Sequence, residues 1–335
     1  MGHRRSSPKR GSLAYLPRAR AESIIGRIRN WPDYQGPPKI LGMMGYKAGM
    51  THAVIVETKP TSPWVSHEIS VPLTIIDVPP LIVFSIRGYK KTPYGLRVVD
   101  QIWSAEVNLD LGRRLTIPKN YNFEEAVKRF ESKLAGMDEL SALVHTQPKL
   151  AGVSKKTPDV AEFRVGGGTI HERFTYLKNL LGKEIRARDI FTEGGYLDTI
   201  SVSKGKGFQG PVKRWGIRIL PNKSRKTVRG VGSTGPWHPA RVFYTVPRAG
   251  QMGFHQRVEY NKRIIKIGED PKEITPKGGF LNYSLIKRDY MLVEGTMPGA
   301  RKRLIKFRLP VRALKLGAVK PPQLVYVSLD SNQGA

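Results

Sequence analysis

The sequence has no cysteine in its 335 residues. Disulfide bonds and thiolate metal sites are therefore excluded, and a cysteine-free chain is typical of a reducing cell interior. Long apolar runs are also missing, since none approaches the roughly 20 residues that cross a bilayer. The basic N-terminus leads into no apolar signal-peptide segment. We expect a soluble cytoplasmic protein that makes no contact with a membrane.

Catalytic motifs are absent as well. Residues 205–210 match G-x-G-x-x-G, but Pro211 and a run of cations follow where a dinucleotide site needs a helix. His171 and Glu172 begin a zinc-protease pattern, yet position 175, where the second histidine belongs, is Thr175. The seven histidines show no metal-ligand spacing. We therefore predict a protein that is not an enzyme, with no cofactor, no metal ion and no small-molecule substrate.

Acidic residues are scarce, because 57 Lys and Arg face 27 Asp and Glu, a net charge of +30. The imbalance is greatest from Lys204 to Lys266, where Glu259 is the single carboxylate among fifteen cations. Glycines and flat side chains are interleaved with these cations. Cations neutralise phosphates, flat rings stack on bases and glycines allow close approach, so the stretch predicts RNA contact. A solvated, disordered basic loop is the alternative interpretation.

The N-terminal 38 residues carry eight cations and five prolines. Prolines interrupt any long helix, so we predict a basic arm that lies along a polyanion. An untethered tail is the alternative.

Short β-branched runs bounded by glycine or proline follow the arm and return after the basic stretch. They predict an antiparallel sheet that curls into a barrel. The expected strands are 40–44, 53–56, 71–78, 81–86, 96–102, 197–202, 264–267, 290–293, 304–307 and 323–328. Between them, apolar stripes after Asn122 and Thr169 predict two helices, each with Glu three residues beyond the cap.

The predicted fold class is mainly β with an α insertion: a β-barrel with a helical insertion, a long basic loop extension and a basic N-terminal arm. The boundaries are 1–38 for the arm, 39–111 for the first part of the barrel, 112–191 for the helical insertion, 192–203 and 264–335 for the remainder of the barrel, and 204–263 for the extension.

Several segments resemble one family. Gly45–Thr51 (GYKAGMT) resembles the signature that opens the β domain of the ribosomal protein L3 family. Residues 214–216 (RWG), 237–240 (WHPA), 248–251 (RAGQ) and 275–280 (TPKGGF) are similar to its archaeal and eukaryotic branch, and the short C-terminus indicates an archaeal type.

This resemblance implies a translation-protein β-barrel and a structural constituent of the large ribosomal subunit. It also implies early binding to 23S-type rRNA near its 3′ end, with the extension reaching toward the peptidyl transferase centre. The expected protein neighbours are the large-subunit proteins L14 and L24e.

The candidate rRNA-binding residues fall into two roles. We expect phosphate contacts from Lys204, Lys206, Lys213, Arg214, Lys223, Arg225, Lys226, Arg229, Arg241, Arg248 and Arg257, and stacking from Trp215, Trp237, His238 and His255. For Trp215 a small hydrophobic plug at the base of the loop is equally expected. From the arm and from a second basic surface near the barrel we add His3, Arg4, Arg5, Arg10, Arg18, Arg20, Arg301, Lys302 and Arg303.

Two other classes of protein fit the composition less well. An RNA-modifying enzyme needs a cofactor loop or paired acids on the basic face, where only Glu259 lies. A chromatin-type DNA binder needs a groove-reading helix or a symmetric dimer, whereas the basic stretch is broken by glycine and proline.

Overall fold

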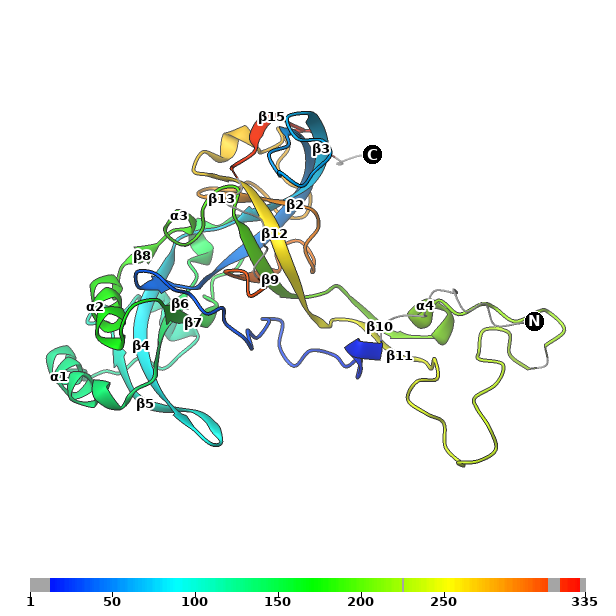
Figure 1. Ribbon diagram of the computed structural model, residues 1–335, viewed down its shortest axis with the longest axis horizontal. Helices are drawn as coiled ribbons and strands as arrows, with labels where there is room; N and C mark the ends of the chain where they lie inside the picture. The colour runs from blue at the N-terminus through cyan, green and yellow to red at the C-terminus, as the bar shows by residue number, and fades with distance from the viewer. Residues whose placement is uncertain (1–12, 225, 313–319, 332–335) are drawn as a thin grey trace. The chain divides into compact units, whose positions relative to one another are not determined.

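The computed structural model describes residues 13–224, 226–312 and 320–331 (Figure 1). Contacts between backbone segments divide the chain into two compact units. Unit 1 consists of residues 1–24 and 202–257, and unit 2 of residues 25–201 and 258–335.

A closed ring of strands forms the larger sheet. Its six strands, in spatial order, are β2 (Gly42–Val56), β3 (Glu68–Asp77), β13 (Tyr290–Glu294), β12 (Gln256–Gly268), β9 (Tyr196–Val202) and β14 (Leu304–Arg308). The ring closes because β14 pairs antiparallel with β2, and β15 (Gln323–Val327) pairs with the far end of β2. The register of β2 against β3 shifts between Lys47 and Gly49, and such a bulge bends a long strand. The predicted barrel is thus present.

A second sheet follows in the same unit. It contains β1 (Lys39–Ile40), β7 (Val160–Gly166), β6 (Glu139–His145), β4 (Leu81–Thr92) and β5 (Gly95–Trp103), with β8 (Glu184–Ile185) on β4. The helices of unit 2 are α1 (Phe123–Lys133), α2 (Ile170–Leu180) and α3 (Ala187–Ile190). Short 3-10 helices lie at Leu13–Tyr15, Leu109–Arg113, Leu134–Gly136, Pro148–Leu150 and Pro271–Glu273. Figure 1 shows α1 and α2 beside this second sheet.

Helix starts follow the local sequence. The Thr169 hydroxyl accepts a hydrogen bond from the Glu172 backbone N–H, and the Glu172 carboxylate accepts one from the Thr169 N–H. This reciprocal pair satisfies two amides that a helix leaves free, so it fixes the first residue of α2. Asn122 caps α1 by accepting from the Glu125 N–H at 3.4 Å. Both predicted helix starts are confirmed.

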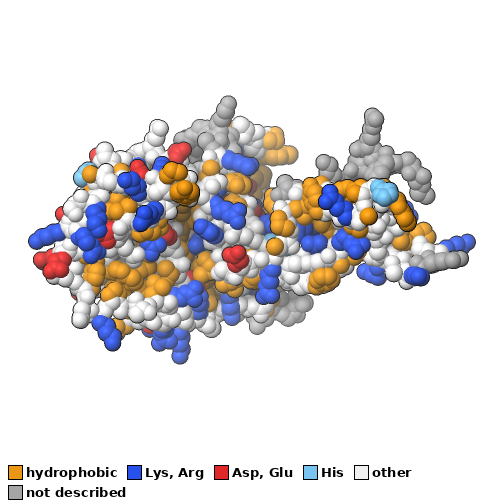
Figure 2. Space-filling model, turned by 90° about the horizontal axis from the view of Figure 1, so that it is seen from below, with side chains coloured by type: hydrophobic (Ala, Val, Ile, Leu, Met, Phe, Trp, Pro, Cys, Tyr) orange, Lys and Arg blue, Asp and Glu red, His pale blue; other side chains and the backbone are white. Residues whose placement is uncertain are grey.

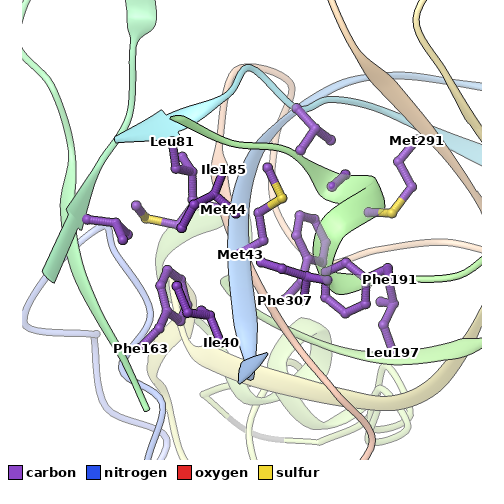
Figure 3. Close-up of a cluster of buried hydrophobic side chains, with 14 of the residues drawn as sticks. Ile40, Met43, Met44, Leu81, Phe163, Ile185, Phe191, Leu197, Met291 and Phe307 are labelled. Carbon is purple, nitrogen blue, oxygen red and sulfur yellow. The ribbon is translucent and has the colours of Figure 1, made fainter. Parts of the chain in front are cut away.

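One hydrophobic core joins the two sheets of unit 2. In Figure 3, Leu81 and Ile185 lie on one side of β2, and Phe191, Leu197 and Phe307 lie on the other, all in one buried cluster. Because β2 has buried residues facing both sheets, it is the structural centre of unit 2.

The mainly β fold class is confirmed, but several boundaries differ from expectation. β4 and β5, expected in the first part of the barrel at 39–111, belong to the second sheet instead. β12 begins at Gln256, inside the predicted extension 204–263. Residues 112–191 hold the two predicted helices, but β6 and β7 lie between them and extend the sheet of β4 and β5. Every residue of β6 is buried, so its sequence lacks the alternation that marks a half-exposed strand. None of the helices in the described ranges is long and apolar enough to span a membrane.

Candidate nucleic-acid interface

The base of the basic extension is a small folded platform. β10 (Gly205–Gln209) pairs antiparallel with β11 (Gly250–Gly253), and α4 (Pro211–Trp215) follows β10 directly. Gly253 has a φ of +70°, and a Cβ there would lie 2.0 Å from the Lys204 carbonyl oxygen. Only glycine fits such a position. Gly253 therefore allows β10, on the outgoing limb of the extension, to pair with β11, on the returning limb.

Trp215 fastens α4 to the returning limb. Its side chain is only 6% exposed, and its indole Nε1 donates to the Arg248 carbonyl at 3.0 Å. The Arg18 guanidinium lies 3.6 Å from the centre of the ring, a cation–π contact. Of the two roles open to Trp215, the structure therefore favours the plug at the base of the loop.

Residues 13–24 of the arm pack on this platform, whereas Ile25, Ile28 and Trp31 pack against the core of unit 2. The Ala21 N–H donates to the Phe254 carbonyl at 2.8 Å, and Arg18 Nη1 donates to the Arg214 carbonyl at 3.0 Å. Arg20 lies over the ring of Phe254. Residues 13–24 are thus bound to the extension. The sequence did not predict this packing because the contacts join residues far apart in the chain, with a separation of 196 for Arg18 and Arg214. The predicted contacts His3, Arg4, Arg5 and Arg10 lie outside the described residues.

Three of the side chains predicted to bind RNA, those of Arg214, His255 and Arg18, instead contact other groups within unit 1. Arg214 donates from Nε to the Gln251 carbonyl and from Nη1 to the Arg248 carbonyl, both at 3.0 Å. His255 is 8% exposed and its Nδ1 lies 2.8 Å from the Ala19 carbonyl. Burial, together with Arg214 and Arg257, lowers the pKa of Arg18. In this structure His255 has no exposed face for a base, because the arm covers it.

The loop between the two limbs carries the exposed groups. From 217 to 249, the described residues form turns and bends but no helix or strand. Within this loop Trp237 is 88% exposed, and His238 beside it is exposed too. The exposed predicted cations of unit 1 are Arg20, Lys204, Lys206, Lys213, Lys223, Lys226, Arg229, Arg241 and Arg248. Arg257 is half-buried, with its guanidinium over the ring of Tyr15, and Arg225 is outside the described residues.

Two further aromatic side chains join this surface, although the sequence did not single them out as contacts. Phe208 is 77% exposed on β10, and Tyr244 is 75% exposed on the loop. Their position inside a run of cations is the signal that marks them, since a solvent-facing ring among cations suits base stacking.

The charge of unit 1 is almost uncompensated. In the two segments of unit 1 at 13–24 and 202–257, Glu22 is the one carboxylate. Among the described residues, no exposed cation of unit 1 forms an ion pair. On the face drawn in Figure 2 the part of the surface at the right carries Lys and Arg with hydrophobic side chains. By contrast, the last three cations of the basic stretch are paired: Lys262 with Glu259, Arg263 with Glu57, and Lys266 with Glu273. Those three belong to the barrel.

The second basic surface is a turn anchored on β2. The Lys302 N–H donates to the Lys47 carbonyl, and the Lys47 N–H donates to the Arg303 carbonyl. Lys302 is exposed, while Arg301 and Arg303 are half-buried and burial lowers the pKa of Arg303.

Across the described ranges, no three His, Asp or Glu side chains converge to hold a metal ion.

Comparison with known proteins gives a consistent result over the whole length. The family model described as ribosomal protein L3 matches residues 1–334. The chain is 48% identical over 332 residues to the large ribosomal subunit protein uL3 of Methanopyrus kandleri, covering 98% of this chain and 91% of that protein. It is 48% identical to uL3 of Archaeoglobus fulgidus over 98% of both chains, and 44% identical to uL3 of Methanothermobacter thermautotrophicus over 99% of both. The chain belongs to the ribosomal protein L3 family.

Proposed function

We propose that unit 1 binds large-subunit rRNA, and that through it this non-enzymatic protein is a structural constituent of the large ribosomal subunit in the cytoplasm. One observation carries the proposal: a loop without regular structure exposes cations, Trp237 and Tyr244 with no carboxylate among them. Exposed cations without acidic partners are stable beside phosphates, and exposed rings gain free energy by stacking on bases.

The difference between the bonded platform and the exposed loop of unit 1 supports this proposal. Trp215, Arg214, Arg18 and His255 hold the platform together through contacts within the chain. The loop projecting from the platform has few internal bonds, such as the Leu220 N–H to the Val228 carbonyl at 2.9 Å. A firm base with an exposed basic loop suits a segment that enters folded RNA.

The finer role is proposed on the resemblance to the family. The rRNA is of the 23S type and is bound near its 3′ end early in assembly. The loop with Trp237 reaches toward the peptidyl transferase centre, and the protein neighbours are L14 and L24e.

A loop variant in which three positive charges are removed tests the proposal. Lys223, Lys226 and Arg229, all exposed, are changed together to Gln, and the matched control changes the exposed Lys119, Lys128 and Lys156 of unit 2 to Gln. The loop variant should bind 23S-type rRNA more weakly than the wild type and enter large subunits more slowly, as measured by filter binding and gradient sedimentation. Equal losses in both variants, or co-migration of the wild type with DNA instead of subunits, would overturn it.

A further inference from the structure

We propose that unit 2 has an RNA site of its own: the cleft lined by Arg29, Trp31, Tyr89, Arg164 and Lys306 binds one nucleotide, its phosphate on the cations and its base on the rings. This inference rests on the proposed rRNA-binding function and adds a site outside the basic extension.

The cleft is formed by segments that the fold brings together in unit 2. Its volume is about 620 Å³. One wall is formed by Arg27, Ile28, Arg29 and Trp31. Tyr89 of β4 and Leu96 of β5 form another, and β6, β7 and β14 supply the remainder. A volume of this size lies within the range of about 300–1,000 Å³ typical of sites for small ligands.

Lys306 is the most informative residue of the cleft. It lies on β14, opposite Met44 of β2 and Ile200 of β9, and it is only 9% exposed. Among the described residues its ammonium group has neither a hydrogen-bond acceptor nor an ion-pair partner within bonding distance. Burial lowers the pKa of Lys306 to about 8, because little water solvates its charge. A buried ammonium group is stabilised by a bound anion.

The acids near Lys306 are already bound to other cations. Glu162 pairs with Arg87 at 3.3 Å, and Glu139 pairs with Arg164 at 3.0 Å and with Lys91 at 3.4 Å. Asp159 accepts hydrogen bonds from Tyr46 and Lys155. The cleft is lined by two carboxylates and four cations: Glu139, Glu162, Arg27, Arg29, Arg164 and Lys306. Its net charge is therefore positive, which suits a phosphate.

The rings in the cleft favour a nucleotide over an acidic protein segment. Trp31 packs edge-to-face with Phe163 at a centroid distance of 5.9 Å, and the Tyr89 hydroxyl accepts from Arg87 at 3.5 Å. Both rings are therefore held in place while lining the cleft. A carboxylate of another protein would use the cations alone, whereas a nucleotide uses cations and rings together.

The test uses the full-length protein and a 23S-type rRNA transcript. Lys306→Met keeps the side-chain volume and removes the charge. Arg29→Gln removes a second charge of the cleft at an exposed position. Lys128→Met, on α1, is the matched control. Lys306→Met and Arg29→Gln should each weaken binding about tenfold, and each should make the log–log dependence on salt shallower by about one. The control should leave both unchanged. With 4-thiouridine in the transcript, crosslinks should appear in peptides containing Trp31 or Tyr89.

The loop variant with Lys223, Lys226 and Arg229 changed to Gln separates the two proposals. If it weakens binding while Lys306→Met and Arg29→Gln match the control, the cleft proposal is overturned and the proposed function stands. If the wild type itself does not bind the transcript, the proposed function fails. Crosslinks within assembled subunits between the cleft and an acidic peptide of another protein would also overturn the nucleotide assignment. Unchanged thermal unfolding of Lys306→Met is needed for any loss to count in favour of the cleft.

Discussion

At the scale of single residues, the two tryptophans of unit 1 have opposite environments. Trp215 is buried under Arg18 and bonded to the Arg248 carbonyl, and Trp237 is 88% exposed. The sequence indicated that both lie in a basic, glycine-rich stretch and left the role of Trp215 open. Only the fold distinguishes them, because burial of Trp215 depends on Arg18 and Arg248, which come from distant parts of the chain.

Trp215→Ala should loosen the platform. Replacing a buried aromatic side chain with alanine typically costs about 3–5 kcal/mol, and here the indole hydrogen bond is lost as well. Backbone amides of β10 and β11 should then exchange with deuterium much faster in the free protein, while those of β3 and β13 keep their rates. Unchanged exchange in β10 and β11 would show that Trp215 does not hold the two limbs together.

Trp237→Ala should leave the free protein unaffected. An exposed ring contributes little to folding, so amide exchange should match the wild type. The loss of one base stack should cost about 1–3 kcal/mol in the complex. The variant should therefore still enter subunits, with a changed peptide-bond rate or inhibitor sensitivity. If it failed to enter subunits while any assembled ribosomes were kinetically normal, the assignment of Trp237 to the RNA-facing tip would be wrong.

Asp77 is a buried carboxyl in the core of unit 2. Its Oδ2 accepts from the Gly152 N–H at 2.9 Å and from the Tyr283 hydroxyl at 2.7 Å. Its Oδ1 is buried, with no hydrogen-bond partner among the described residues. Burial raises the pKa of Asp77 from 3.8 to about 6, because the charged form is poorly solvated.

Asp77→Asn should change how stability depends on pH. Because the folded pKa is the higher one, Asp77 stabilises the fold below about pH 4 and loses that contribution as the pH rises to about 6. The variant cannot ionise, so its free energy of unfolding relative to wild type should rise by about 3 kcal/mol over this interval and then stay level. Urea unfolding from pH 4 to 7.5 measures this, with the exposed Asp33→Asn as control. A difference independent of pH would contradict it.

At the scale of elements, the strands were the most predictable part. Glycine and proline bound the short β-branched runs, and each of the ten expected strands lies wholly or mostly within a β-strand of the structure. The cap at Thr169 was readable because its hydrogen bonds are local. β6 was missed since a fully buried strand has no alternation, and the packing of residues 13–24 was missed since no local pattern encodes it.

The contrast between platform and loop predicts a protease pattern. Trypsin should first cut the free protein after Lys223, Lys226, Arg229 or Arg241, because that backbone lies outside any strand or helix. The exposed Lys90 and Lys91 are the internal control, since they lie in β4 and its ladder with β5. Bound rRNA should protect the loop and leave the control rate unchanged. Equal cutting rates at both places in the free protein would contradict the contrast.

At the scale of the whole molecule, the two units differ in how they treat charge. All the ion pairs among the described residues lie within unit 2, including the buried Arg263–Glu57 pair at 2.7 Å. Unit 1 leaves its exposed cations without carboxylate partners among the described residues. The exposed cations of unit 1 therefore remain available to phosphates, although unpaired cations such as Lys306 also occur in unit 2.

This distribution predicts the salt dependence of rRNA binding. Each cation that meets a phosphate contributes about −0.7 to −0.9 to the log–log slope of affinity against salt, so contacts from most exposed cations of unit 1 give about −5 to −7. Changing Lys223, Lys226 and Arg229 to Gln should make the slope shallower by about 2 to 3. Changing Lys119, Lys128 and Lys156 of unit 2 should not alter it, although the net charge falls equally. A wild-type slope shallower than about −2 would mean that the exposed cations remain solvated when RNA binds.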